Sequence, residues 1–280
     1  MSVAWSGSEF HNDTRETPVE VAAAEKMFDP IKGRFLRCKR QTDALSRPEP
    51  GSKLDLIDQL TSPFNTSEQV RTYLLVAIDS LGVLLRYLSK TKELPMLAFY
   101  SMIRSAIEST SYGIWLLRGN GNNKKASLSL RMSLQNFKSF RSLGAAFSSS
   151  DFGADIDTTI RSLHNSLRGL EPDAIDKAVQ ATNVIMAVDG YANPRASFFT
   201  GLQVWRSTSG IVHANAPVMA ALLERHPDGP NPGDPATRTS RLTFTVGFIE
   251  TAVENIETLL KLYGSSSAAP VKASTPKPSS

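Results

Sequence analysis

The chain has 280 residues, of which 41% are hydrophobic and 21% are charged, a composition that suits a globular protein of one large domain or two small ones. The sequence shows neither a secretory signal nor an uninterrupted apolar stretch for a membrane span, and its single cysteine excludes an internal disulfide framework and a thiolate zinc cluster. We therefore expect a cytoplasmic protein without membrane contact, and its net charge of +4 permits contact with a polyanion without requiring it.

The N-terminal part of the chain combines polar segments with one predicted helix. Residues 1–16 are small and polar, and we expect them to be disordered. A short helix is predicted over 17–29, because Thr17 can cap it and Pro18 suits its first turn. The next segment, 30–52, is interpreted as a solvated loop or short helix, or alternatively as a phosphate-binding strip. Its basic residues are Lys32, Arg34, Arg37, Lys39 and Arg40.

The rest of the chain has the residue spacing of amphipathic helices. Over 67–90, apolar residues recur every three or four positions, as one buried helix face requires. They form the stripe Leu74, Ile78, Leu81, Leu85 and Leu88. Further helices are predicted over 95–119, 124–147, 155–170, 172–188, 196–214, 217–226 and 237–263.

These elements predict an all-α fold, an antiparallel bundle of helices with disordered tails at both ends. We find no strand-like alternation of useful length and no internal repeat. The expected organisation is a disordered stretch over 1–16, an N-terminal helical and basic extension over 17–65, the helical bundle over 66–263, and a low-complexity, disordered tail over 264–280.

Charged residues interrupt two apolar helices in the middle of the chain. Arg104 and Glu108 are four positions apart and therefore share one helix face. They form either a core-facing pair, since an unpaired buried charge is costly, or an intrahelical ion pair on the solvent face. Arg131 lies on the following helix, where it either reaches Glu108 across the helix–helix contact or is a plain surface arginine.

A second polar group lies late in the chain. Arg206 and His213 stand seven positions apart, almost two helical turns, so their directions differ by about 20°. Ser209 lies between them on the same face, and Gly210 leaves room for a close neighbour. Pro217 should end the helix shortly before it, which leaves His213 in the last turn, where unpaired carbonyls favour a protonated imidazole. The alternative is a histidine that merely caps the helix.

Arg206, the polar Ser207 that follows it, and His213 resemble the R-x(4–6)-H motif of HEPN domains. The wider layout of residues 66–263 is similar to that of HEPN-like bacterial helical proteins. The features that carry this similarity are Arg104, Glu108, Trp115, Leu116, Leu117, Arg131, Trp205, Ser209 and His213.

The resemblance implies a metal-independent endoribonuclease, of the kind found among toxins and phage-defence effectors, acting on RNA. It implies Arg206, His213 and Ser209 as catalytic residues, usually completed by the same pair from a second subunit, so a homodimer is expected. Substrate-binding or supporting roles fall to Arg104, Glu108, Arg131 and Ser207. An antitoxin or regulatory protein is the further partner that this class implies.

No cofactor and no metal are expected, because the remaining histidines lack a matching ligand spacing. These histidines are His11, His164 and His226. One alternative function is a non-catalytic helical module that binds a protein partner, a nucleotide or a small ligand through a buried Arg/Glu/His network. Another is phosphate or nucleic-acid binding led by the basic residues between positions 32 and 40.

Overall fold

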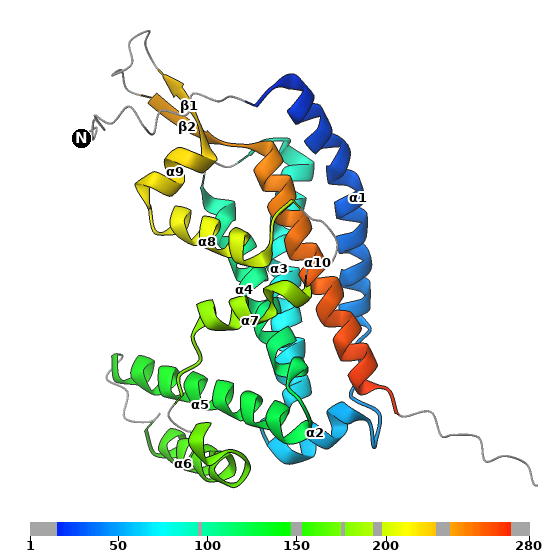
Figure 1. The fold of residues 1–280 in the computed structure, drawn as a ribbon, viewed down its shortest axis with the longest axis vertical. Helices are drawn as coiled ribbons and strands as arrows, with labels where there is room; N and C mark the ends of the chain where they lie inside the picture. Colours follow the sequence, from blue (N-terminus) through cyan, green and yellow to red (C-terminus); the bar gives the residue numbers. More distant parts are fainter. Residues whose placement is uncertain are drawn as a thin grey trace, which may run out of the picture. The chain divides into compact units, whose positions relative to one another are not determined.

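The computed structural model describes residues 16–94, 97–146, 153–174, 177–192, 198–227 and 236–269. Nearly all of the regular structure in these residues is helical, which confirms the all-α class (Figure 1). The helices are α1 Pro18–Asp43, α2 Lys53–Thr61, α3 Thr66–Thr91, α4 Ala98–Arg118, α5 Asn122–Ala146, α6 Gly153–Leu170, η3 Pro172–Ala174, α7 Ala181–Ala192, α8 Gly201–Val212, α9 Ala216–Leu222 and α10 Leu242–Ser267. The strands β1 Leu223–Pro227 and β2 Ala236–Ser240 form a small antiparallel sheet.

The chain forms two compact units, and each is assembled from segments that are far apart in sequence. The first unit takes Met1–Ala44, Thr72–Trp115 and Gln180–Leu260, and the second takes Leu45–Arg71, Leu116–Val179 and Lys261–Ser280. The segment that was predicted to be one N-terminal extension, 17–65, is therefore shared between the two units.

Helix α1 continues where the sequence analysis expected a break. A capping box between Thr17 and Glu20 starts the helix, which then runs through Pro30 to Asp43. The prediction of a short helix ending before Pro30 is wrong, because the buried stripe of α1 continues past the proline. That stripe consists of Ala24, Ile31, Phe35 and Cys38, each at most 3% exposed. Its burial offsets the hydrogen bond that a proline removes from a helix.

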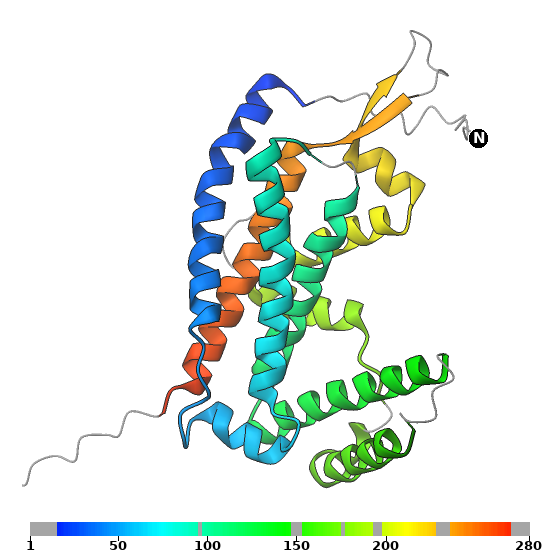
Figure 2. The same ribbon diagram turned by 180° about the vertical axis from the view of Figure 1, so that it is seen from behind.

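Helices α1, α3, α4 and α10 form the core of the first unit and lie alongside one another in both views (Figure 1, Figure 2). A Cβ atom on Gly113 of α4 would lie 2.6 Å from a methyl of Leu259 in α10, so any larger residue here would require the buried Leu259 side chain to shift. A Cβ atom on Gly82 of α3 would lie 3.5 Å from the Phe35 ring of α1. The predicted apolar stripe on α3 is confirmed as buried, with no member more than 7% exposed: Leu74, Ile78, Leu81, Leu85 and Leu88.

Helix α3 is, within the described residues, long and apolar enough to cross a membrane by composition alone. No such stretch was expected from the sequence. One side of α3 is the buried stripe of a protein core, whereas Leu75, Val76 and Val83 of the same helix are exposed. Core helices pass the same test, so this property does not identify a membrane protein.

The β1–β2 hairpin is a feature that the sequence analysis missed, since it assigned 217–226 and 237–263 to helices. Strand β1 pairs antiparallel with β2 so that Leu223 lies opposite Ser240, and both residues are buried. Each strand has only five residues, which is too short for alternation to distinguish a strand from a helix. The residues between the strands, 228–235, lie outside the described part of the chain.

The second unit contains α2, α5 and α6. Its core is a cluster of aliphatic side chains from α5 and α6: Leu130, Leu134, Ile156, Ile160, Leu163 and Leu167. Phe64, which follows α2, packs edge-on against Phe137 with the ring centroids 5.5 Å apart. The helix predicted over 172–188 is instead divided, because residues 177–180 have no regular structure and α7 begins at Ala181 in the first unit.

Both predicted tails fall mostly on residues outside the described part, 1–15 and 270–280. Glu16 is described, and its carboxylate accepts hydrogen bonds from the backbone N–H groups of Leu242 at 2.7 Å and Thr243 at 2.6 Å. A carboxylate in this position stabilises the N-terminus of α10. At the other end, residues 264–267 are the last turn of α10 and not part of a tail.

Candidate functional site

Helix α8 is fixed at its start by side chains from the first unit. A capping box forms between Thr200 and Gln203: each residue's side chain accepts a hydrogen bond from the other's backbone N–H, at 2.8 Å and 3.2 Å. The Leu202 N–H donates to the carboxylate of Asp189 in α7 at 2.8 Å. The buried face of the helix recurs at helical spacing: Gly201, Val204, Thr208 and Ile211. The helix is thus shorter than the predicted 196–214.

The C-terminal end of α8 is closed by backbone hydrogen bonds. The Ala214 N–H donates to the carbonyl three residues earlier at 2.9 Å, and the Asn215 N–H donates to the Gly210 carbonyl at 2.8 Å, the pattern of a Schellman motif. Ala214 adopts the left-handed conformation that this motif requires, with a φ of 52°. His213 is the C-cap residue, one position beyond the last helical residue.

Arg206, Ser209 and His213 lie on the side of α8 that faces away from the buried residues. Arg206 and His213 are exposed, and Ser209 is partly buried. At about 100° per residue, the directions of Arg206 and His213 differ by about 20°, and their positions are about 10 Å apart along the helix axis. Within the described part of the chain, neither side chain makes a hydrogen bond or an ion pair. The structure therefore brings the three predicted residues to one helix side.

Ser207 and Gly210 lie next to these three residues in the sequence of α8, and both are partly buried. Gly210 was expected to leave room for a close neighbour, and the neighbour is Val218 of α9: a Cβ atom on Gly210 would lie 2.7 Å from the Val218 side chain. Helix α9 is therefore packed directly against the end of α8 that carries His213.

Arg104 and Glu108 lie together on α4, as predicted, with Arg104 Nε and Glu108 Oε2 3.6 Å apart. Trp205 of α8 joins the pair, because its indole N–H donates to the same Glu108 oxygen at 3.2 Å. The Arg104 guanidinium carbon is 5.7 Å from the centre of the Trp205 ring, within cation–π range. The side chains of Arg104 and Glu108 are 26% and 29% exposed, so the pair is neither fully buried nor on the open solvent face. These contacts tie α8 to α4.

The charge of Glu108 also acts on Tyr112, one turn further along α4. Burial, together with the negative charge of Glu108, raises the pKa of the Tyr112 phenol to about 12, and the positive charge of Arg104 opposes this shift. The Tyr112 ring lies against Tyr73 of α3, with the centroids 5.8 Å apart. The phenol therefore stays protonated at neutral pH.

Arg131 belongs to the second unit, whereas Arg104 and Glu108 belong to the first. Its guanidinium donates to the Lys177 carbonyl at 2.9 Å. Burial lowers the pKa of Arg131, and the charge of Glu171 partly compensates. The predicted contact between Arg131 and Glu108 would join the two units, and it stays a prediction.

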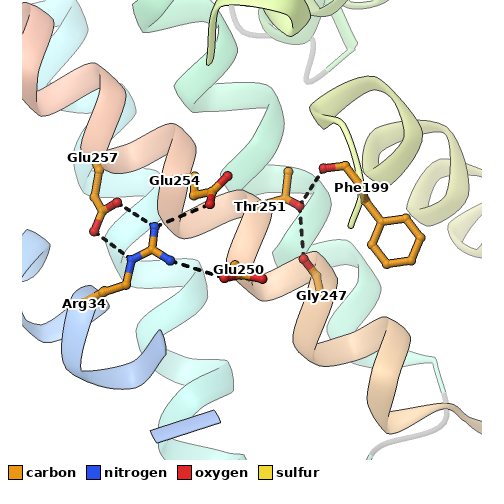
Figure 3. Close-up of polar contacts among 7 residues, drawn as sticks. All are labelled: Arg34, Phe199, Gly247, Glu250, Thr251, Glu254 and Glu257. Carbon is orange, nitrogen blue, oxygen red and sulfur yellow. Dashed lines mark hydrogen bonds and ion pairs between the residues drawn. The ribbon is translucent and has the colours of Figure 1, made fainter. Parts of the chain in front are cut away.

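A charged cluster that the sequence analysis did not identify joins α1 to α10. Figure 3 shows Arg34 of α1 reaching three glutamates on one side of α10. The guanidinium makes a bidentate contact with Glu257, at 3.0 Å and 2.7 Å, and lies 3.4 Å from Glu250 and 3.7 Å from Glu254. Hydrogen bonding to Glu257 is the main reason that the pKa of Arg34 is raised. In the sequence, the three glutamates stand four and then three residues apart, a spacing that places them on one helix face. This spacing is the signal from which an acidic cluster could have been predicted.

This cluster changes the interpretation of the basic segment between positions 32 and 40. Arg34 is bound by carboxylates, and Lys39 forms an ion pair with Asp43 at 2.6 Å. Arg37 and Arg40 are exposed on α1. Residues 30–43 of the segment 30–52 belong to α1 and form ion pairs, so the loop interpretation is wrong for them and the charge that they offer to a polyanion is reduced.

Figure 3 also shows how α10 holds the segment that precedes α8. The Thr251 hydroxyl lies 3.1 Å from the carbonyl of Phe199 and 3.1 Å from that of Gly247. Phe199 directly precedes the capping box of α8, so this contact fixes where the helix begins.

Within the described residues, no group of three or more His, Cys, Asp or Glu side chains is arranged to hold a metal ion. Of the three remaining histidines, His164 lies on α6 and His226 on β1. His11 lies outside the described residues.

No protein-family model, curated protein or solved structure matches this chain. The fold and the site therefore define a structural class of protein and no family. It is a helical protein of two compact units with a small β-hairpin, in which a guanidinium, a hydroxyl and an imidazole share one helix side. The resemblance to HEPN domains stays a prediction.

Proposed function

We propose that this protein is a metal-independent endoribonuclease that uses Arg206 and His213. The observation that supports the proposal most strongly is their common direction on α8, combined with exposure of both and the absence of internal partners within the described residues. A cation without a carboxylate partner is available to a phosphate. Ser209, between them, adds a hydroxyl that can hydrogen-bond a phosphate oxygen.

The proposed reaction uses the nucleophile that RNA itself supplies. The 2′-hydroxyl loses its proton to a base and its oxygen attacks the adjacent phosphorus, while the bond from phosphorus to the 5′-oxygen breaks and that oxygen takes up a proton. His213 performs one of these proton transfers. Arg206 holds the charge that develops on the phosphate through a bidentate contact. The products are a 2′,3′-cyclic phosphate and a 5′-hydroxyl.

A second copy of the chain would supply the other proton transfer, so the proposal includes a homodimer. Arg104 and Glu108 act as positioning residues, because their contacts with Trp205 fix α8 against α4. Ser207 lies next to Arg206 and is assigned the same supporting role. Arg131 is left out of the proposed site, since its guanidinium binds the Lys177 carbonyl in the second unit. The proposal includes a role as a toxin or phage-defence effector in the cytoplasm. An antitoxin or a regulatory protein is the proposed partner.

The test is RNA cleavage by the purified full-length chain in EDTA. Wild-type protein should cleave single-stranded RNA and leave cyclic phosphate ends, and His213→Ala should lower the rate at least about 100-fold, the usual contribution of one acid–base group. Arg206→Ala should cause a loss of similar size. Arg86→Ala is the matched control, because it removes an exposed arginine from α3 in the same unit, outside the basic segment, and should leave the rate unchanged.

Absence of cleavage by the wild-type protein would reject the proposal, as would an unchanged rate in His213→Ala. Light scattering should find a dimer in solution, and Arg206→Ala and His213→Ala proteins mixed together should recover partial activity if the site is composite. A monomer that still cleaves RNA would reject the composite site.

One observation favours the second candidate, a non-catalytic helical module. The Arg104–Glu108–Trp205 contacts form a partly buried network whose members bind one another, as a purely structural role requires. His213 lies outside this network and is exposed. The module alternative therefore predicts that Glu108→Gln lowers the melting temperature and that His213→Ala changes neither stability nor any response to RNA.

A further inference from the structure

The second unit contains a basic pocket of about 360 Å³ that the proposed nuclease site does not use. The pocket lies between α5 and the irregular segment 177–179. Three cationic side chains line it, Arg131, Lys138 and Lys177, and its described lining residues include no carboxylate. A concave surface with this charge attracts anions.

The wall of the pocket formed by 177–179 is held against α5 by side-chain hydrogen bonds. The Gln135 amide pairs with both backbone groups of Val179: it donates to the carbonyl at 2.9 Å and accepts from the N–H at 2.8 Å. Arg131 donates to the carbonyl of Lys177 at 2.9 Å. A segment without regular structure is thus fixed at two points, and the pocket exists before any ligand arrives.

The helical spacing of α5 places the polar lining on one side. Arg131, Gln135 and Lys138 are four and three positions apart, so they share a helix face. Burial lowers the pKa of Arg131, so its charged form is partly destabilised by its surroundings. An anion beside the guanidinium would offset this effect. An arginine already oriented by a hydrogen bond is well suited to bind a phosphate.

Apolar side chains complete the lining. Leu134 is 3% exposed and Val179 is 5% exposed, and both border the pocket. The volume falls at the lower end of the range of about 300–1,000 Å³ that is usual for small-molecule sites. A bare inorganic ion would leave the apolar part of this space without a contact.

We propose that the pocket bounded by Arg131, Lys138 and Lys177 binds a small organic phosphate, whose dianion contacts the three cations and whose compact apolar body lies against Leu134 and Val179. The site is separate in sequence and in unit from Arg206 and His213. It therefore does not depend on the ribonuclease proposal.

The test uses phenyl phosphate as the probe, titrated into the full-length protein and followed by calorimetry. Wild-type protein should bind it. Lys138→Ala should weaken binding about tenfold, the effect of losing one cation–phosphate contact. Lys138 is the first variant because no side-chain contact holds it in the described structure, whereas Arg131 also fixes the 177–179 segment. Arg131→Ala, checked for folding by circular dichroism, should weaken binding more.

Two control variants, a control ligand and a change of pH test whether the phosphate binds in this site. Arg141→Ala removes a cation from the same helix outside the pocket, where Arg141 pairs with Asp157 at 3.0 Å, and should leave binding unchanged. His213→Ala should also leave it unchanged. Phenol, which lacks the phosphate, should not bind, and binding of phenyl phosphate should be weaker below pH 6, because the phosphate then carries less charge.

Several results would overturn the proposal. The first is that phenyl phosphate does not bind at millimolar concentration. The second is that Arg141→Ala and Lys138→Ala lose affinity equally. The third is that inorganic phosphate binds as tightly as phenyl phosphate. The last result would show that the apolar lining makes no contribution.

Discussion

Arg34 and Arg206 are two arginines on helices of the first unit with opposite surroundings. Arg34 lies between three glutamates of α10, and its side chain is 24% exposed. Arg206 is exposed and has no internal partner within the described residues. An arginine whose charge is bound by carboxylates holds helices together, and one without such partners is available to a ligand. This difference separates a structural cation from a candidate functional one, although both lie on helices of the same unit.

The largest expected effect comes from removing the bound arginine. Arg34→Ala leaves three neighbouring, partly buried carboxylates without their shared cation, so we expect the free energy of unfolding to fall by about 2 kcal/mol. Arg206→Ala should change it by less than about 0.5 kcal/mol, as for most exposed positions. Urea denaturation of both variants measures the contrast. Equal losses in the two variants would remove the distinction between the arginines.

The second prediction concerns the packing beside the unbound arginine. Gly210→Ala places a methyl group within 2.7 Å of Val218, where α9 must move to accommodate it. We expect a loss of about 1–2 kcal/mol despite the better helix propensity of alanine. Gly169→Ala on α6 is the control, because nothing lies within 4 Å of the added atom, and it should be neutral or stabilising. Adding Val218→Ala to Gly210→Ala should restore part of the loss, because it removes the two methyl groups at 2.7 Å and leaves the Val218 Cβ position at 2.9 Å. No recovery at all would show that the two residues are not in contact.

The smallest predicted effect tests the network that positions α8. Glu108→Gln removes the negative charge that helps to raise the pKa of Tyr112, while the opposing charge of Arg104 remains. The pKa of Tyr112 should therefore fall below its present value of about 12. A spectroscopic titration of the tyrosines, compared with Tyr112→Phe, measures this shift. An unchanged titration would mean that Glu108 and Tyr112 are not close.

Local spacing was sufficient to predict some of these features and not others. The stripe on α3, the Arg104–Glu108 pair and the common side of Arg206 and His213 all follow from positions three, four or seven residues apart. The Arg34 cluster joins residues more than 200 positions apart, and no local pattern indicates which helix face meets which. Pro30 also misled the prediction, because a proline normally ends a helix and tertiary burial prevailed here.

The hairpin and the pocket show a second reason why local patterns were insufficient. The paired strands are short, and their partner choice depends on backbone hydrogen bonds that side-chain periodicity does not encode. The 177–179 segment is positioned by Gln135 and Arg131, whose acceptors are backbone atoms. A sequence identifies side chains, and contacts to backbone carbonyls become visible only when the chain path is known.

The single cysteine of the chain lies on α1 one turn beyond Arg34. Cys38 is 1% exposed, and burial raises the pKa of its thiol to about 12, an effect to which the nearby Glu257 charge adds. An alkylating reagent reacts with the thiolate and needs access to the sulfur, so the folded protein is doubly protected against it. The rate of alkylation therefore reports how often α1 separates from the helices that bury its apolar stripe, and it can be measured without introducing any label or mutation.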